Sequence, residues 1–91
     1  MFILISYDVT DNKRRNKICN TLKNYGKRVQ FSVFECLLEN KDLMRLKTRL
    51  LKLIKEDEDK LRIYQLCENC KRNILTYGTI KVTEDEEVYI V

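Results

Sequence analysis

One carboxylate in this sequence, Asp8, stands between a short apolar run and a strongly basic segment. Residues 2–5 read Phe-Ile-Leu-Ile, as a buried strand does, and four of residues 13–17 are Lys or Arg. A carboxylate can hold a hard metal ion, which polarises a phosphate and lowers the pKa of a bound water. Basic side chains hold phosphates through their charge. This spacing therefore indicates a minimal site for phosphodiester chemistry, built from Asp8 and the basic segment.

Both features also have a structural explanation, which the residues alone leave open. An Asp at the end of a strand commonly accepts hydrogen bonds from nearby backbone amides. A basic helix is commonly a solvated surface, although cations in a first helical turn oppose the helix macrodipole. The net charge is +4, and acids concentrate at residues 56–59 and 84–87. The rest of the chain is therefore basic, which favours a polyanionic partner.

The hydrophobic pattern predicts the elements that position Asp8. The first strand ends near Asp8, and Thr10 or Asp11 is expected to cap the helix that follows. Apolar residues recur in this helix at three- and four-residue spacings, and Gly26 is expected to end it in a left-handed conformation. The apolar stripe comprises Ile18, Cys19, Leu22 and Tyr25.

Beyond this helix the pattern changes to period two. It predicts a second strand from Lys27 to about Leu38, with Val29, Phe31 and Val33 on one face. Asn40 is expected to cap a second helix, whose core stripe comprises Leu43, Leu46, Leu50 and Leu53. Further on, the pattern predicts a third strand at 61–66, a tight turn at 67–70, a fourth strand at 73–77 closed by Gly78, and an apolar tail at 88–91.

A strict count of these elements gives β-α-β-α-β-β plus the tail strand. If the second strand bends into two around residues 35–38, the order becomes that of an α+β, ferredoxin-like βαββαβ sandwich. The sequence has no Pro and no repeat, so we expect one domain over residues 1–91. Residues 78–91 would form a C-terminal tail whose strand pairs with a sheet edge of this subunit or, in a homodimer, of its partner.

The composition disfavours several other classes. No apolar run approaches the roughly 20 residues that cross a bilayer, and no secretory signal is visible, so we expect a cytoplasmic protein. The cysteines are expected to be reduced thiols, with Cys67 and Cys70 as small, semi-buried turn residues. Because the chain has no His, a four-ligand zinc site would have to recruit Cys19 and Cys36, and it is disfavoured.

Three motifs in a fixed order resemble the Cas-two family, the smaller of the two core CRISPR adaptation proteins, from end to end. The first is Tyr7-Asp8-Val9, followed by Asp11, Lys13, Arg14, Arg15 and Ile18. The second is residues 26–35, which read Gly-Lys-Arg-Val-Gln-Phe-Ser-Val-Phe-Glu. The third is residues 64–70, which read Tyr-Gln-Leu-Cys-Glu-Asn-Cys.

The resemblance implies a ferredoxin-like homodimer that buries its two sheets against each other and adds the C-terminal strand of each chain to the partner's sheet. It also implies that this dimer binds RNA or DNA and the larger CRISPR integrase. In some members it implies magnesium-dependent cleavage of phosphodiesters, with one Mg²⁺ ion held across the two-fold axis by Asp8 of both chains, and no organic cofactor. Asp8 is then both the catalytic and the metal residue. The nucleic-acid residues carried over by position are Tyr7, Arg14 or Arg15, Arg28, Ser32 and Phe34, and the basic segment adds Lys17.

Several alternatives stay open at this point. Tyr7 and Phe34 could stack on bases or pack in the core. The function could be that of a magnesium-dependent endonuclease, a non-catalytic scaffold for DNA and the integrase, or a toxin-like ribonuclease of related fold. Asp8 is compatible with both the endonuclease and the scaffold. An RNA-recognition module is disfavoured because the strands lack the glycine-and-aromatic pattern of such sheets.

Overall fold

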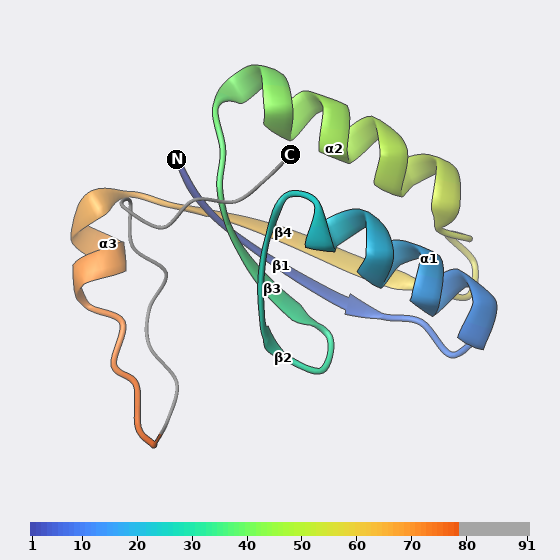
Figure 1. Cartoon of the computed structure of the whole chain (residues 1–91), viewed down its shortest axis with the longest axis horizontal. Coiled ribbons are helices and arrows are strands. Elements are labelled where there is room, and N and C mark those ends of the chain that lie inside the picture. Colours follow the sequence, from blue (N-terminus) through green and yellow to red (C-terminus); the bar gives the residue numbers. More distant parts are fainter. Residues whose placement is uncertain (79–91) are drawn as a thin grey trace.

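The computed structural model describes residues 1–78, which form one antiparallel sheet with two long helices on a single face (Figure 1). The strand order is β2-β3-β1-β4. The elements along the chain are β1 (Phe2–Asp8), α1 (Asn12–Lys23), β2 (Gly26–Gln30), β3 (Val33–Leu37), α2 (Asn40–Leu53), β4 (Lys60–Leu66) and the short α3 (Glu68–Arg72). This βαββαβ order confirms the predicted ferredoxin-like sandwich.

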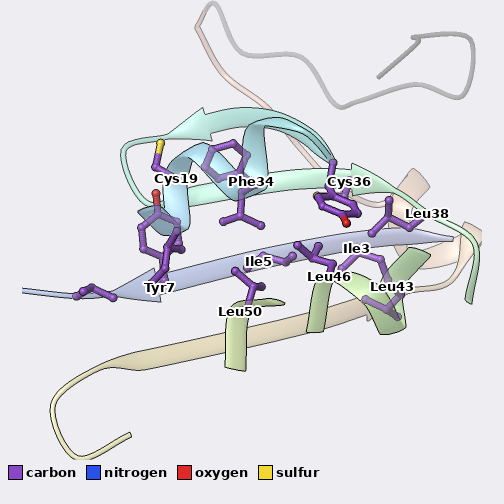
Figure 2. Close-up of a cluster of buried hydrophobic side chains, with 14 residues drawn as sticks. Ile3, Ile5, Tyr7, Cys19, Phe34, Cys36, Leu38, Leu43, Leu46 and Leu50 are labelled. Atoms are coloured by element: carbon purple, nitrogen blue, oxygen red, sulfur yellow. The ribbon is translucent and has the colours of Figure 1, made fainter. Parts of the chain in front are cut away.

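Period-two alternation in β1 and β3 separates a helix-covered face from an open one. Figure 2 shows the core between the sheet and the helices, where β1 and β3 meet the leucines of α2. The side chains that pack there include Ile3, Ile5, Tyr7, Ile18, Leu22, Phe34, Cys36, Leu43, Leu46 and Leu50. The predicted stripes of both helices are therefore confirmed, and Leu53 packs against the same core while only partly buried.

The predicted second strand is a hairpin, and its break lies at residues 31–32 and not at 35–38. β2 and β3 pair through Lys27 opposite Glu35 and Arg28 opposite Phe34, and the register shifts between Arg28 and Gln30. This irregularity changes the face that later residues occupy, so the single alternation from Lys27 to Leu38 was the wrong interpretation. The turn has no Gly, Pro or Asn to mark it in the sequence.

Gly26 does not end α1 in a left-handed conformation, which corrects that expectation. Asn24 is the C-cap of α1 in a right-handed conformation, and Gly78 is the one glycine of residues 1–78 with a positive φ. Gly26 begins β2, where an added Cβ would lie 2.4 Å from the Glu35 carbonyl oxygen and 2.5 Å from Cys36 Sγ. Glycine is therefore required here by the close approach of two strands.

The two long helices begin within a residue of the predicted positions. Asp11 caps α1, since its Oδ2 accepts the Arg14 backbone N–H at 2.9 Å. The cap of α2 is Glu39 and not Asn40, and it makes no hydrogen bond through its side chain. The N-terminal ammonium donates to the Leu38 carbonyl oxygen at 2.8 Å, which ties the start of β1 to the start of α2.

The segment after β4 differs from the prediction. Residues 68–72 form α3 where a turn was expected, and residues 73–77 form no strand. The predicted tail strand at 88–91 lies outside the described residues. None of the helices in residues 1–78 is long and apolar enough to span a membrane.

Candidate functional site

Asp8 lies at the exit of β1, exposed, and opposite Lys60 at the start of β4. It belongs to the sheet face without helices, together with Leu4 and Ser6 of the same strand. This open face is hollowed by a cavity of about 710 Å³. Its lining residues are Leu4, Ser6, Tyr7, Asp8, Val29, Gln30, Val33, Glu35, Lys60, Arg62, Tyr64, Leu75, Thr76 and Tyr77.

The open face combines an apolar floor with charges of both signs. Leu4 and Val33 lie on neighbouring strands, and Arg62 Nη1 donates to the Tyr64 hydroxyl at 3.3 Å. Leu75 and Tyr77 are 76% and 83% exposed in the segment that follows α3. Sheets normally bury such a face against a second layer. In residues 1–78 the helices leave this face uncovered.

Arg14 does not face solvent as a free phosphate ligand, because it is held by a carboxylate. Its guanidinium donates to both oxygens of Asp59, from Nε at 2.8 Å and from Nη2 at 2.9 Å, and also to Glu58 at 3.1 Å. The Asp59 side chain is fully buried, and its Oδ2 also accepts the Lys55 N–H at 2.8 Å. The hydrogen bond from Arg14 is the main reason that the pKa of Asp59 lies below its usual value.

Arg15 and Arg28 instead gather around the tip of the β2–β3 hairpin. Their guanidinium carbons lie 5.8 Å and 5.0 Å from the centre of the Phe31 ring, and that residue is 69% exposed. Arg28 also donates from Nε and Nη2 to the Phe31 carbonyl oxygen at 3.0 Å and 2.7 Å. Arg15 donates to the Val9 carbonyl oxygen at 3.1 Å. These contacts hold two cations in fixed positions beside an exposed aromatic ring.

A second hollow, of about 460 Å³, opens between α1 and this hairpin. We call it the basic hollow; its lining residues are Tyr7, Arg15, Asn16, Cys19, Asn20, Lys23, Arg28 and Phe31. Among the described residues, three cations and two amides line it and no carboxylate does. Two predicted nucleic-acid residues, Lys17 and Ser32, lie outside this lining. Lys17 is exposed on α1. Ser32 is in the hairpin turn, where its carbonyl oxygen accepts the Tyr7 N–H at 3.1 Å. The basic hollow suits an anionic ligand.

Tyr7 and Phe34 are core residues, so neither ring is available to stack on a nucleic-acid base. Phe34 is 0% exposed and Tyr7 is 3% exposed, and their rings stack with centroids 6.4 Å apart (Figure 2). Burial, followed by the neighbouring Cys19, raises the pKa of Tyr7 to about 12. The exposed aromatic ring on this side of the molecule is that of Phe31.

The donor set within residues 1–78 limits what metal one chain can hold. No group of three or more His, Cys, Asp or Glu side chains lies together in that range. Magnesium prefers six oxygen ligands and keeps several waters, so it can be bound by one or two carboxylates. Asp8 therefore fits magnesium as one carboxylate ligand, and waters or further oxygen groups would have to complete the coordination.

Several residues of these two hollows were not singled out from the sequence. Lys60 and Arg62 line the open face because β4 alternates, with Leu61 and Ile63 packed against the core. The alternation predicted the strand itself, but the polar residues on its other side were not identified as site residues. Lys23 joins the basic hollow because it lies two helical turns after Asn16 on one side of α1. Phe31 was assigned to a strand, so its exposure at a turn was missed.

A four-stranded ferredoxin-like sheet with a carboxylate at the end of its first strand defines a class of small α+β proteins. Within that class, the sequence model for "CRISPR associated protein Cas2" matches residues 1–74 of this chain. The chain therefore belongs to the Cas2 family, as the resemblance to the Cas-two family predicted.

Relatives from bacteria match the chain over most of its length. A protein of Chloroflexus aurantiacus named "CRISPR-associated endoribonuclease Cas2 1" is 45% identical and is covered completely by the match, as is this chain. A protein of Halalkalibacterium halodurans named "CRISPR-associated endonuclease Cas2" is 44% identical, with 86% of each chain covered.

Solved structures agree with the fold. The crystal structure of Streptococcus pyogenes Cas2 superposes with a TM-score of 0.77 at 36% identity, covering 86% of this chain and all of that one. A chain of the structure described as "Partial Cas6-RT-Cas1--Cas2 complex" has a TM-score of 0.68 at 30% identity, with 96% of this chain and 98% of that chain covered.

Proposed function

We propose that this chain acts in CRISPR spacer acquisition, as a homodimer that binds nucleic acid and the larger CRISPR integrase. Membership of the Cas2 family supports this function, as does the similarity to a chain from a structure that also contains Cas1. The observation that carries the proposal is that the described residues form two distinct hollows. An open sheet face bears Asp8, and a separate basic hollow lies on the helix side.

The open face is the proposed dimer interface. Its floor includes the apolar Leu4, Val29 and Val33, and within residues 1–78 the helices cover the other face. Two copies that pack these faces about a two-fold axis would give each sheet its second layer. The same packing would bring the two Asp8 carboxylates into one site, which a single chain cannot form.

Asp8 is the residue that would hold a magnesium ion in such a dimer. When bound, magnesium supplies a Lewis acid for a phosphate oxygen and lowers the pKa of a coordinated water. The chain's own contribution is the position of the carboxylate, since Asp8 is fixed by its pairing with Lys60 on β4. The names of the relatives as endoribonuclease and endonuclease support hydrolysis of phosphodiesters by this site.

The basic hollow is the proposed phosphate surface. Arg15 and Arg28 are preorganised by backbone carbonyls and by Phe31, and Lys23 adds a third cation. Preorganised cations lose little side-chain entropy when they bind a phosphate. Lys17 and Ser32 extend this surface along α1 and the hairpin turn. Such contacts bind the backbone and carry no sequence information directly.

A non-catalytic scaffold is the second candidate function. It is favoured by the single carboxylate that each chain offers at Asp8, because sparse ligands hold magnesium weakly without nucleic acid. Scaffold and nuclease use the same phosphate surface, so both require the basic hollow. They differ in whether the carboxylate of Asp8 is needed.

The test is spacer insertion by the integrase together with this chain. A variant that combines Arg15→Gln with Arg28→Gln is expected to lose most insertion, because the phosphate surface loses two charges. Asp8→Asn is expected to retain insertion. Lys47→Gln, on the exposed side of α2, removes one charge from a surface outside both hollows and serves as the control. Full insertion by the double variant would contradict the proposed nucleic-acid surface.

A further inference from the structure

Two of the four cysteines are exposed, and they lie together at the start of α3. Cys67 immediately precedes this helix and Cys70 lies within it, whereas Cys19 and Cys36 are buried in the core. The sequence predicted semi-buried turn residues, and the structure instead leaves both thiols open to solvent. A pair of accessible, neighbouring thiols differs chemically from an inert core cysteine.

The turn between the two cysteines is held by local hydrogen bonds. Cys67 Sγ accepts the backbone N–H of Cys70 at 3.4 Å, and the Cys67 carbonyl oxygen accepts the N–H of Lys71 at 2.9 Å. The Cys67 sulfur is therefore held against the backbone of Cys70 within one Cys-x-x-Cys turn, the spacing at which redox-active cysteine pairs occur.

The two thiols are also polarised in opposite directions. The backbone N–H of Cys70 and then its thiol lower the pKa of Cys67, while the hydrogen bond and the charge of Cys67 raise the pKa of Cys70. The thiolate is the attacking form of cysteine, so Cys67 is the nucleophile of the pair. Cys70 is the partner that resolves the product.

We propose that Cys67 and Cys70 form a reversible dithiol–disulfide site that exchanges with low-molecular-weight disulfides. The Cys67 thiolate attacks one sulfur of the small disulfide, which releases one thiolate and leaves a mixed disulfide on the protein. Cys70 then attacks Cys67 Sγ, forms the intramolecular bond and releases the second small thiolate. The protein loses two electrons, the small disulfide gains them, and the two cysteine protons pass to the released thiols.

The site lies at the other end of β1 from Asp8. Phe2 pairs with Leu66, which directly precedes Cys67, whereas Asp8 pairs with Lys60. The chemistry therefore does not depend on the function proposed above. Burial, reinforced by the charge of Glu35, raises the pKa of Cys36 to about 12, so this thiol provides an unreactive internal reference.

The test uses the reduced, full-length protein with iodoacetamide and with oxidised glutathione, followed by peptide mass analysis. At pH 7 we expect Cys67 to be alkylated on the order of tenfold faster than Cys70, with Cys19 and Cys36 unmodified until the chain is unfolded. Glutathione disulfide should remove two hydrogen atoms from the peptide that contains both exposed cysteines, and dithiothreitol should restore them.

Two single variants separate the roles of the sulfurs. Cys70→Ser should stop at the mixed disulfide on Cys67, and Cys67→Ser should react on the order of tenfold more slowly. Equal alkylation of Cys67 and Cys70, or a wild-type protein that stops at mixed disulfides, would overturn the proposal. Zinc binding that protects both thiols without any disulfide forming would also overturn it and would assign the pair to a metal.

Discussion

Arg14 and Arg15 are adjacent in the sequence, yet the fold gives them different roles. Arg14 is bound to Asp59, 45 positions further along the chain, while Arg15 lies beside Phe31 at the hairpin tip. The sequence could indicate that one of them meets phosphate, because both are basic and near Asp8. The sequence could not show which of the two arginines is free to bind phosphate, because the carboxylate that binds Arg14, Asp59, is distant in the sequence.

We predict that Arg15→Gln weakens nucleic-acid binding and that Arg14→Gln weakens the fold. For Arg15→Gln, the slope of log affinity against log salt should fall by about 0.9 on duplex DNA, the value of one lost phosphate contact. Arg14→Gln should lower the melting temperature, because it leaves the buried Asp59 carboxylate without its partner. Salt-dependent binding and thermal melts of both variants measure this. A reversed pattern would restore Arg14 as the phosphate ligand.

Phe31 and Phe34 form a second pair, for which the sequence predicted a nucleic-acid role at Phe34 and none at Phe31. Phe31→Ala should reduce nucleic-acid affinity, because Arg15 and Arg28 lose the ring that helps to fix them, while the free energy of unfolding changes little. Phe34→Ala should cost about 3–5 kcal/mol of stability, as a fully buried aromatic ring is lost. Denaturant unfolding with binding measurements tests both. Unchanged affinity for Phe31→Ala would remove the ring from the proposed surface.

At the scale of elements, the amphipathic helices were predictable and the hairpin was not. Leu43, Leu46 and Leu50 recur at helical spacing, and their burial in α2 follows directly from that period. The turn at residues 31–32 instead depends on Arg28, whose guanidinium binds the Phe31 carbonyl oxygen. Because the Arg28 side chain binds the turn carbonyl, the turn forms without Gly or Pro. The sequence pattern therefore predicted one continuous strand in place of two.

The loop between α2 and β4 contains Asp59, whose ion pair with Arg14 anchors α1. The contribution of this ion pair to the free energy of unfolding depends on pH. The pKa of Asp59 lies below its ordinary value of 3.8, chiefly because Arg14 donates to it. A lowered folded-state pKa adds stability that is complete above the unfolded pKa and is lost as pH falls through the folded value. The loss therefore begins below about pH 4.

We predict that Asp59→Asn removes the pH-dependent contribution of this ion pair to the free energy of unfolding. The variant should be less stable than the wild type at pH 6, and the difference in the free energy of unfolding should shrink as the pH falls below about 4. Urea unfolding of both proteins across pH 3 to 6 gives the comparison. A difference that stays constant over this range would show that Asp59 contributes by packing and not by its charge.

At the scale of the whole molecule, a dimer that packs its two sheets against each other was an expectation from the family resemblance and not from the residue pattern. The residue pattern itself favoured a dimer through the apolar tail at residues 88–91, which lies outside the described residues. In the described residues, Leu4, Val33 and Tyr64 line one hollow from three neighbouring strands, and this is the surface proposed for the dimer. Surfaces of this kind depend on sheet order, which a single sequence does not give.

The proposed dimer is tested by a substitution that places a positive charge on the open sheet face. Val33→Lys should shift the protein towards a monomer at micromolar concentration, because a lysine would have to be buried between two sheets. Thr48→Lys, on the exposed side of α2, is the matched control and should leave the dimer intact. Sedimentation of the three proteins decides the matter. A wild-type monomer under these conditions would contradict the proposed interface.

The most direct test of the account is phosphodiester cleavage by Asp8→Asn, measured with magnesium and with a chelator. The substitution keeps the size of the side chain and removes one ligand charge from each chain of the dimer. Glu39→Gln changes a carboxylate at the α2 end of the sheet and serves as the control. We predict that Asp8→Asn lowers magnesium-dependent cleavage by about 100-fold or more, with nucleic-acid affinity and dimer stability retained. Magnesium-dependent cleavage that persists unchanged in Asp8→Asn would contradict the assignment of Asp8 as the metal ligand.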